Sequence, residues 1–180
     1  MKRILVLVMA ATFALGAAAA PAGAADAELV RNSRRALDSL TATNQAARQL
    51  RKKATAVLVF PKMIKAGFLF GGQIGDGVLL EGDRVAGYYN SVAASYGLQV
   101  GGQVFGYALF FMNAGALDYL KESSGWEIGS GPSVVVVDQG MAKSFSSTTL
   151  TQDVYAFIFD QKGLMAGVGI QGSKITRVDE

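Results

Sequence analysis

Glycine constrains this chain more than any other residue, because it recurs in similar stretches of sequence. The stretch "GFLFGGQIGDGVLL" at 67–80 aligns with "GLQVGGQVFGYALF" at 97–110, and both run Gly, three residues, Gly-Gly-Gln and a β-branched residue. A weaker copy, "GLMAGVGIQG", begins at Gly163. Within strands, glycine allows bulges, tight coiling and the close approach of another backbone. The repetition therefore predicts the strands of a strongly bent sheet or a small barrel.

Two other uses of such a motif are excluded. A phosphate-binding loop requires a helix after its glycines, whereas "VLLEGD" here predicts a strand and a turn, and no Gly-Lys-Ser/Thr follows. Glycine-mediated packing of membrane helices requires about 18 apolar residues in a row, and nothing after the N-terminal segment approaches that length. The glycines are therefore interpreted as structural.

The N-terminus predicts an export signal. Lys2 and Arg3 precede an apolar stretch over 4–15, and small residues follow, with cleavage expected between Ala20 and Ala25. We therefore expect a signal peptide over 1–25 and a single domain over 26–180, which is exported and is periplasmic, associated with the cell envelope, or secreted. The absence of Cys excludes disulfides and a lipidated N-terminal cysteine.

Basic residues gather in the first part of this domain. Between Asp26 and Lys65 the net charge is +6, whereas from Ala66 onward it is −5. This asymmetry predicts an anionic partner for the basic segment, although a helix with a solvated face would also produce it. The nine candidate binding residues are Arg31, Arg34, Arg35, Arg48, Arg51, Lys52, Lys53, Lys62 and Lys65.

Residues 26–54 predict two helices, because they lack Pro and Gly and their apolar residues recur at helical spacing. Asn44 is the expected N-cap of the second helix. After it we expect a short strand, then a helical turn that begins at Pro61 and stops at Gly67.

Beyond Gly67, short apolar runs alternate with turn residues at Asp76-Gly77, 81–83 and 160–163. One helix is expected near 114–123, with Asn113 as its cap. The predicted class is α+β, with N-terminal helices packed on a Gly-rich, strongly curved antiparallel sheet or small barrel.

Catalysis is not expected. The chain has no His and no Cys, which removes the usual nucleophile systems and the usual zinc ligands. Asp76, Glu81 and Asp83 are close in sequence but lie in predicted turns, without the spacing of a calcium loop. Tyr88, Tyr89 and Trp126 are interpreted as core or strand-edge aromatics. We expect no enzyme activity, no cofactor and no metal.

The basic helical segment fits an anionic lipid surface better than nucleic acid. Its cations lie beside an apolar stripe that could enter the headgroup region, and each adds about 1 kcal/mol near an anionic surface. An export signal argues against nucleic acid, and no aromatic platform for base stacking is interleaved with the cations. Anionic phospholipids, or a membrane surface, are the expected partner; a protein partner cannot be named.

The run "KATAVLVFPKMIKAGFLFGGQIGDGVLL" resembles the opening signature of the SYLF lipid-binding domain. The similarity continues through "YYNSVAASYGLQVGGQ", "NAGALDYL", "GWEIGSGPSVVVV" and "VYAFIFDQKGLMAGVGIQGSKI", in the order of the family. The resemblance implies lipid binding without catalysis, through an N-terminal amphipathic helix and neighbouring basic residues, which here are the nine candidates.

Eukaryotic members of the family bind phosphoinositides beside SH3 or FYVE modules, and some act on actin. Bacterial relatives are stand-alone exported proteins, and the chain resembles these. Because the sequence has no SH3 or FYVE segment, actin regulation is not expected. An exported member would meet phosphatidylglycerol, cardiolipin or lipopolysaccharide.

Two alternatives remain open from the sequence. The chain could be a structural or partner-binding envelope protein whose basic segment docks onto its own acidic body, which buried Arg–Asp pairs would indicate. It could also be a barrel that holds an apolar ligand, which an internal cavity would indicate.

Overall fold

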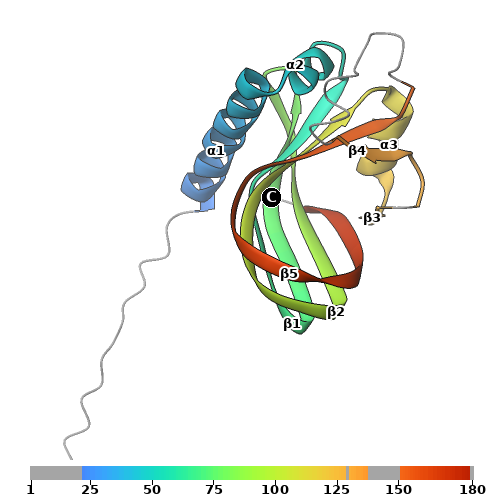
Figure 1. Ribbon diagram of the computed structural model, residues 1–180. Helices are drawn as coiled ribbons and strands as arrows, with labels where there is room; N and C mark the ends of the chain where they lie inside the picture. Colours follow the sequence, from blue (N-terminus) through green and yellow to red (C-terminus); the bar gives the residue numbers. More distant parts are fainter. Residues whose placement is uncertain (1–21, 129, 138–150, 179–180) are drawn as a thin grey trace, which may run out of the picture.

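The computed structural model describes residues 22–128, 130–137 and 151–178 (Figure 1); the predicted signal peptide lies almost wholly outside these residues. The helices are α1 (Ala22–Thr43), α2 (Gln45–Arg51) and α3 (Ala114–Glu122), and the strands are β1 (Ala56–Glu81), β2 (Arg84–Phe111), β3 (Trp126–Glu127), β4 (Val134–Val136) and β5 (Val154–Val178). Helices and one curved sheet share the domain, so the predicted α+β class is confirmed.

The sheet has the strand order β1-β2-β5-β3. These neighbours are antiparallel, as predicted, while the short β4 runs parallel to β5 at its start. Three strands form nearly all of the sheet, and β2 lies between the other two for most of its length. Their ladders hold β1, β2 and β5 as one curved ribbon (Figure 1).

The three long strands correct the prediction of many short ones. β1, β2 and β5 span 26, 28 and 25 residues, several times the usual strand length. The expected turn at Asp76-Gly77 lies inside β1, where Asp76 accepts a hydrogen bond from Asn90 on β2 at 2.7 Å. The segment 160–163 likewise remains in β5, with positive φ at Asp160. The turn at 81–83 is confirmed, with a φ of 60° at Gly82.

The long strands stay continuous because glycine makes room for the ribbon to curve back on itself. A Cβ at Gly75 would collide with Met63, and a Cβ at Gly77 would collide with the ring of Phe60. Side chains of the earlier part of β1 thus fill the space that the glycines of its later part leave free. The structural interpretation of the glycines is confirmed.

The repeated motifs mark the place where the ribbon bends. On β1, Gly67 faces Gly71 so closely that a Cβ on it would lie 2.8 Å from the Cα of Gly71. On β2, Gly101 has a φ of 136°, and a Cβ there would press on the carbonyl oxygen of Leu164 in β5. We call residues 66–75, 91–104 and 163–173 the bent end; in Figure 1 it lies opposite α2.

Pro61 was expected to begin a helical turn, but it lies inside β1, so this prediction was wrong. The register of β1 against β2 shifts between Phe60 and Met63, which makes a bulge at Pro61. A proline has no N–H to donate to a ladder, so within sheets it occurs at bulges and on edge strands. Both conditions hold here, because β1 is the outer strand of the sheet.

Two buried clusters hold the helices on the sheet. Leu37, Leu40 and Leu50 of the first two helices pack with Val59 and other residues of β1, β2 and β5. The second cluster joins residues of α3 to Trp126 and to the alternate side chains of the strands, among them Leu58, Phe60 and Leu109. Neighbouring residues of β1 thus point into different clusters, which explains the unbroken apolar run at its start.

We expect Gly101→Ala to lower the free energy of unfolding by about 2 kcal/mol or more, because the new methyl group meets backbone at a φ that L-residues rarely adopt. Urea unfolding followed by circular dichroism measures this change. The matched control is Gly72→Ala, since a Cβ at Gly72 has no neighbour closer than 3.9 Å. Equal stability of the two variants would contradict the assigned role of Gly101.

Candidate functional site

The nine predicted binding residues divide into three groups by their surroundings. Arg34, Arg48 and Arg51 are exposed but make hydrogen bonds within the chain. A second group has exposed side chains that form no hydrogen bond or ion pair with another described residue: Arg31, Arg35, Lys52 and Lys53. Lys62 and Lys65 lie on β1, between its bulge and the bent end; Lys62 is exposed and Lys65 is partly buried.

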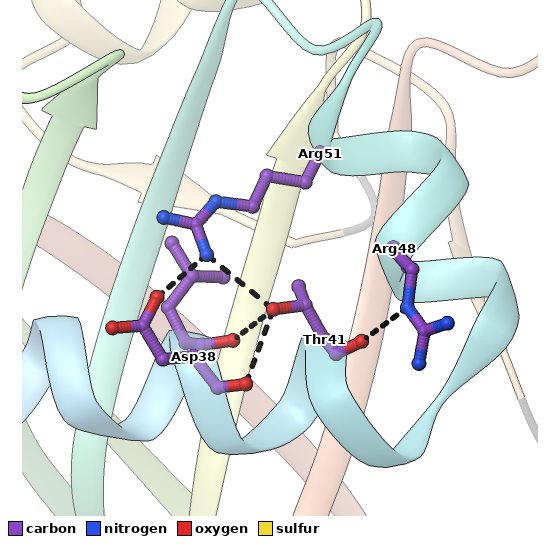
Figure 2. Close-up of polar contacts among 5 residues, drawn as sticks. Asp38, Thr41, Arg48 and Arg51 are labelled. Atoms are coloured by element: carbon purple, nitrogen blue, oxygen red, sulfur yellow. Dashed lines mark hydrogen bonds and ion pairs between the residues drawn. The ribbon is translucent and has the colours of Figure 1, made fainter.

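Two members of the first group, Arg48 and Arg51, hold the corner between α1 and α2 (Figure 2). Arg48 donates from Nε to the carbonyl oxygen of Thr41 at 2.9 Å and from Nη2 to that of Ala42 at 2.6 Å. These carbonyls belong to the last turn of α1, where a cation satisfies groups that have no partner inside the helix. Arg51 donates to Asp38 at 2.7 Å and to the hydroxyl of Thr41 at 3.3 Å.

One helix cap and the contacts of two arginines hold the corner together. The side chain of Asn44 accepts a hydrogen bond from the backbone N–H of Ala47 at 3.0 Å, so the predicted N-cap is confirmed. The Arg51–Asp38 pair brings the end of α2 beside the C-terminal half of α1, and Lys52 and Lys53 follow directly. Since Arg35 precedes Asp38 by one helical turn, the exposed cations of both helices adjoin one corner.

The apolar stripe of α1 is not available to a membrane in this structure. Leu37 and Leu40 are buried against the sheet, and Leu29, Val30 and Ala36 pack against the same cluster. The helix therefore presents its charged side outward. The idea that the stripe enters the headgroup region would require α1 to leave the sheet.

Internal pairing of the basic segment with the acidic body is slight. The ion pair that the helices form, Arg51–Asp38, lies within the helical segment, and its side chains are 40% and 66% exposed. Arg34 does reach the sheet, where it donates to the carbonyl oxygen of Asp83 at 2.8 Å. This contact is to backbone, so it leaves the charge of Arg34 without a carboxylate partner among the described residues.

The carboxylates that were considered for chemistry are separated. Asp76 bonds to Asn90, Glu81 pairs with Lys121 and Arg84, and Asp83 is exposed at the hairpin turn. The hydrogen bond from Lys121, supported by Arg84, lowers the pKa of Glu81 despite the opposing effect of burial. Within the described ranges no group of His, Cys, Asp and Glu could hold a metal ion.

The aromatic residues considered with them belong to the core. Tyr89 and Trp126 are each 1% exposed, and burial raises the pKa of Tyr89. Tyr88 packs partly buried against the cluster beneath α1. The interpretation of these residues as core aromatics is confirmed.

Side chains of β1 fill part of the space inside the curved sheet. Phe60 and Met63 lie against the glycines of the later part of β1, as described above. A hollow of about 610 Å³ lies at the bulge, lined by Pro61, Gly106, Lys162 and their neighbours, and opens to the surface. It lies beside the bent end, at the edge of one packed cluster.

The sequence reasoning missed the exposed apolar residues of the bent end, among them Phe68, Phe70, Tyr96 and Leu164, which are 66–89% exposed. A signal for them was present, because residues 66–75, 91–104 and 163–173 contain no Asp, Glu, Lys or Arg. No described helix is long and apolar enough to cross a membrane.

Residues 92–180 match the protein-family model described as "Ysc84: Las17-binding protein actin regulator". This is the SYLF family, whose domains are associated with lipid binding. Over these residues the resemblance predicted from the sequence is confirmed. The match begins inside β2 and includes β5, so all nine candidate basic residues lie before it. A search of curated proteins finds no match.

We expect Arg48→Ala to lower the free energy of unfolding by about 1 kcal/mol, because two carbonyls at the end of α1 lose their donor. Lys52→Ala is the matched control and should change it by less than about 0.5 kcal/mol, since Lys52 is exposed at the end of α2. Urea unfolding measures both values. If Arg48→Ala left the free energy of unfolding unchanged, the corner would not depend on this contact.

Proposed function

We propose that this chain is an exported, non-enzymatic protein that binds anionic phospholipid membranes reversibly through the basic surface of α1 and α2. The observation that carries the proposal is the group of exposed cations without partners among the described residues, Arg31, Arg35, Lys52 and Lys53, on a domain of a lipid-binding family. Lys62 and Lys65 extend the basic surface along β1.

The expected attachment is weak and sensitive to salt. Four cations at about 1 kcal/mol each give about 4 kcal/mol, which corresponds to a dissociation constant on the order of 1 mM. Charges at the surface of a membrane lose their attraction within about 10 Å at 0.1 M salt. Cations already bound inside the chain, such as Arg48 and Arg51, contribute less because they must keep their internal partners.

A partner-binding envelope protein is the second candidate. The contact from Arg34 to the hairpin turn favours it, because it fixes α1 to the sheet and makes the basic surface a rigid part of the domain. The family description names actin regulation and Las17 binding, but nothing in the residues described here adds a reason to propose either for this chain. Anionic lipid has the stronger support, since the cations face outward.

Co-sedimentation with vesicles tests the lipid proposal. The purified protein should bind vesicles that contain phosphatidylglycerol and should bind pure phosphatidylcholine vesicles at least 10-fold less, with binding to the anionic vesicles falling as salt rises from 50 to 300 mM on the order of several fold. Arg31→Glu with Arg35→Glu should reduce binding to anionic vesicles at least 10-fold, because each reversal replaces attraction by repulsion.

The matched control is Lys174→Glu with Arg177→Glu, which makes the same change in net charge at exposed positions of β5. An equal loss in the control would mean that net charge, and not the surface of α1, governs binding. No binding of the parent protein to anionic vesicles would reject the proposal and favour a protein partner.

Export has a separate test. When the full chain is produced in a bacterium with a periplasm, the mature protein should accumulate outside the cytoplasm with a mass that corresponds to cleavage between Ala20 and Ala25. Cell fractionation and mass spectrometry measure both properties. Replacement of Leu7 by Arg should block processing, whereas an unprocessed chain in the cytoplasm of the parent strain would contradict the prediction.

A further inference from the structure

The bent end carries most of the large apolar side chains that are exposed in the described part of the chain. The described chain has fourteen exposed large apolar side chains, and nine of them belong to the bent end. They are Phe68, Leu69, Phe70, Ile74, Val92, Tyr96, Val100, Val104 and Leu164. A concentration of this kind on a soluble surface marks a place of contact, because water solvates isolated apolar side chains at little cost but not a continuous patch.

The patch is also free of charge. The bent end contains no Asp, Glu, Lys or Arg, although charged residues make up 17% of the chain. Its polar residues are Ser, Gln and Tyr, together with many glycines. Such a composition suits a contact with the apolar side of the headgroup region, where a carboxylate or an ammonium group would be costly.

The apolar side chains are held on paired strands. Phe68 is paired with Val100 and Phe70 with Tyr96, and the rings of Phe70 and Tyr96 lie 5.1 Å apart. Gly102 is paired with Leu164, which is 89% exposed. Leu69 has a φ of 60°, a conformation that is unusual for a leucine. The bend thus presents these residues at one end of the molecule in a fixed arrangement (Figure 1).

Lysines border the patch on the side of the bulge. Lys65 precedes Gly67 by two residues, and Lys162 precedes Leu164 by two residues. The ladders place Ile64, Val104 and Lys162 in one row across the three strands. Long lysine side chains can reach phosphate groups while apolar neighbours lie deeper. This order of apolar tip and basic border is complementary to an anionic lipid surface.

The same border disfavours a second copy of the chain as the occupant. In a symmetric contact between two bent ends, the lysines of both copies would face one another across the interface. Like charges at such a contact oppose association. Anionic lipid removes this conflict, because its phosphates meet the lysines while its acyl chains meet Phe68 and Phe70.

We propose that the bent end is a second membrane contact, which inserts its apolar side chains among the headgroups and upper acyl chains of an anionic bilayer. This inference rests on the proposed function for its partner, but different residues carry it. Insertion stops at the interface, because β1 and β5 have no described strand beyond them at the bend and their outer backbone groups need water or headgroups.

A fluorescent label at the tip tests insertion directly. The chain contains no cysteine, so Leu164→Cys creates a unique site for an environment-sensitive dye such as NBD. With phosphatidylglycerol vesicles the emission should shift to the blue and rise at least twofold, and lipids with a quencher on the upper acyl chain should quench it. The control, Glu122→Cys on the exposed side of α3, should keep the emission of a label in water.

Binding of unlabelled variants gives a second measurement. Phe68→Ser with Phe70→Ser should weaken binding to anionic vesicles at least 10-fold and leave the dependence on salt unchanged, because it removes apolar contact and no charge. Tyr119→Ser with Val136→Ser is the control, at exposed apolar positions outside the bent end. Urea unfolding establishes that each variant is folded before its binding is compared.

The outcomes separate this inference from the proposed function. A Leu164 label that stays in water while the protein sediments with anionic vesicles overturns insertion and leaves the basic surface as the contact. A label that inserts while Arg31→Glu with Arg35→Glu binds normally supports insertion and rejects the basic surface. Emission that shifts without vesicles and follows protein concentration means that bent ends pack against each other, which overturns the proposal. Absence of binding to any vesicle rejects both.

Discussion

The close approach between the two parts of β1 is the constraint on which the rest of the structure depends. Phe60 and Met63 occupy space that side chains at Gly77 and Gly75 would fill, so the ribbon can curve back only where glycine permits it. With 26 residues in β1 alone, a flat ribbon would leave both faces of the strand in water. Curvature instead returns the ends of the strands to one packed region, where the helices cover them.

This packing decides which surfaces remain for a partner. The apolar residues of the helices cover the sheet, so the outward surface of α1 is mainly polar and charged. The bend lies beyond the reach of the helices, and its apolar residues stay exposed. A membrane would therefore meet electrostatic attraction from one part of the molecule and apolar contact from another. Salt weakens the electrostatic attraction but not the apolar contact, so the two contributions can be measured separately.

Local chemistry in the sequence predicted those features that depend on neighbouring residues. Asn44 and Asn113 cap helices because a side-chain oxygen three residues before a free N–H is enough to start one. Asp76-Gly77 was predicted to form a turn and Pro61 to begin a helical turn. Both predictions were wrong because these local patterns take no account of a partner strand. The ladder to β2 keeps both places extended, and Gly77 is required by Phe60, a residue seventeen positions earlier that no local pattern connects with it.

The candidate site also combines features that are visible in the sequence with features that depend on the fold. The basic character of 26–65 is visible in the sequence, but the internal bonds of Arg48 and Arg51 are not, since they depend on how α2 folds back beside α1. The apolar patch was harder to recognise, because its members come from three strands that are far apart along the chain. The absence of charge in all three segments is a sequence property, and it becomes meaningful once the ladders place those segments together.

The bulge at Pro61 affects whether a strand from another chain can pair with the edge of the sheet. β1 is the outer strand, and a long free edge is a template on which a strand from another chain can add. Pro61 offers no donor on that edge, the bulge interrupts its spacing, and Lys62 beside it adds a charge. The strong curvature then prevents a straight strand from pairing with β1 for more than a few residues. The outer edge of the sheet therefore offers few places where a strand from another chain could add.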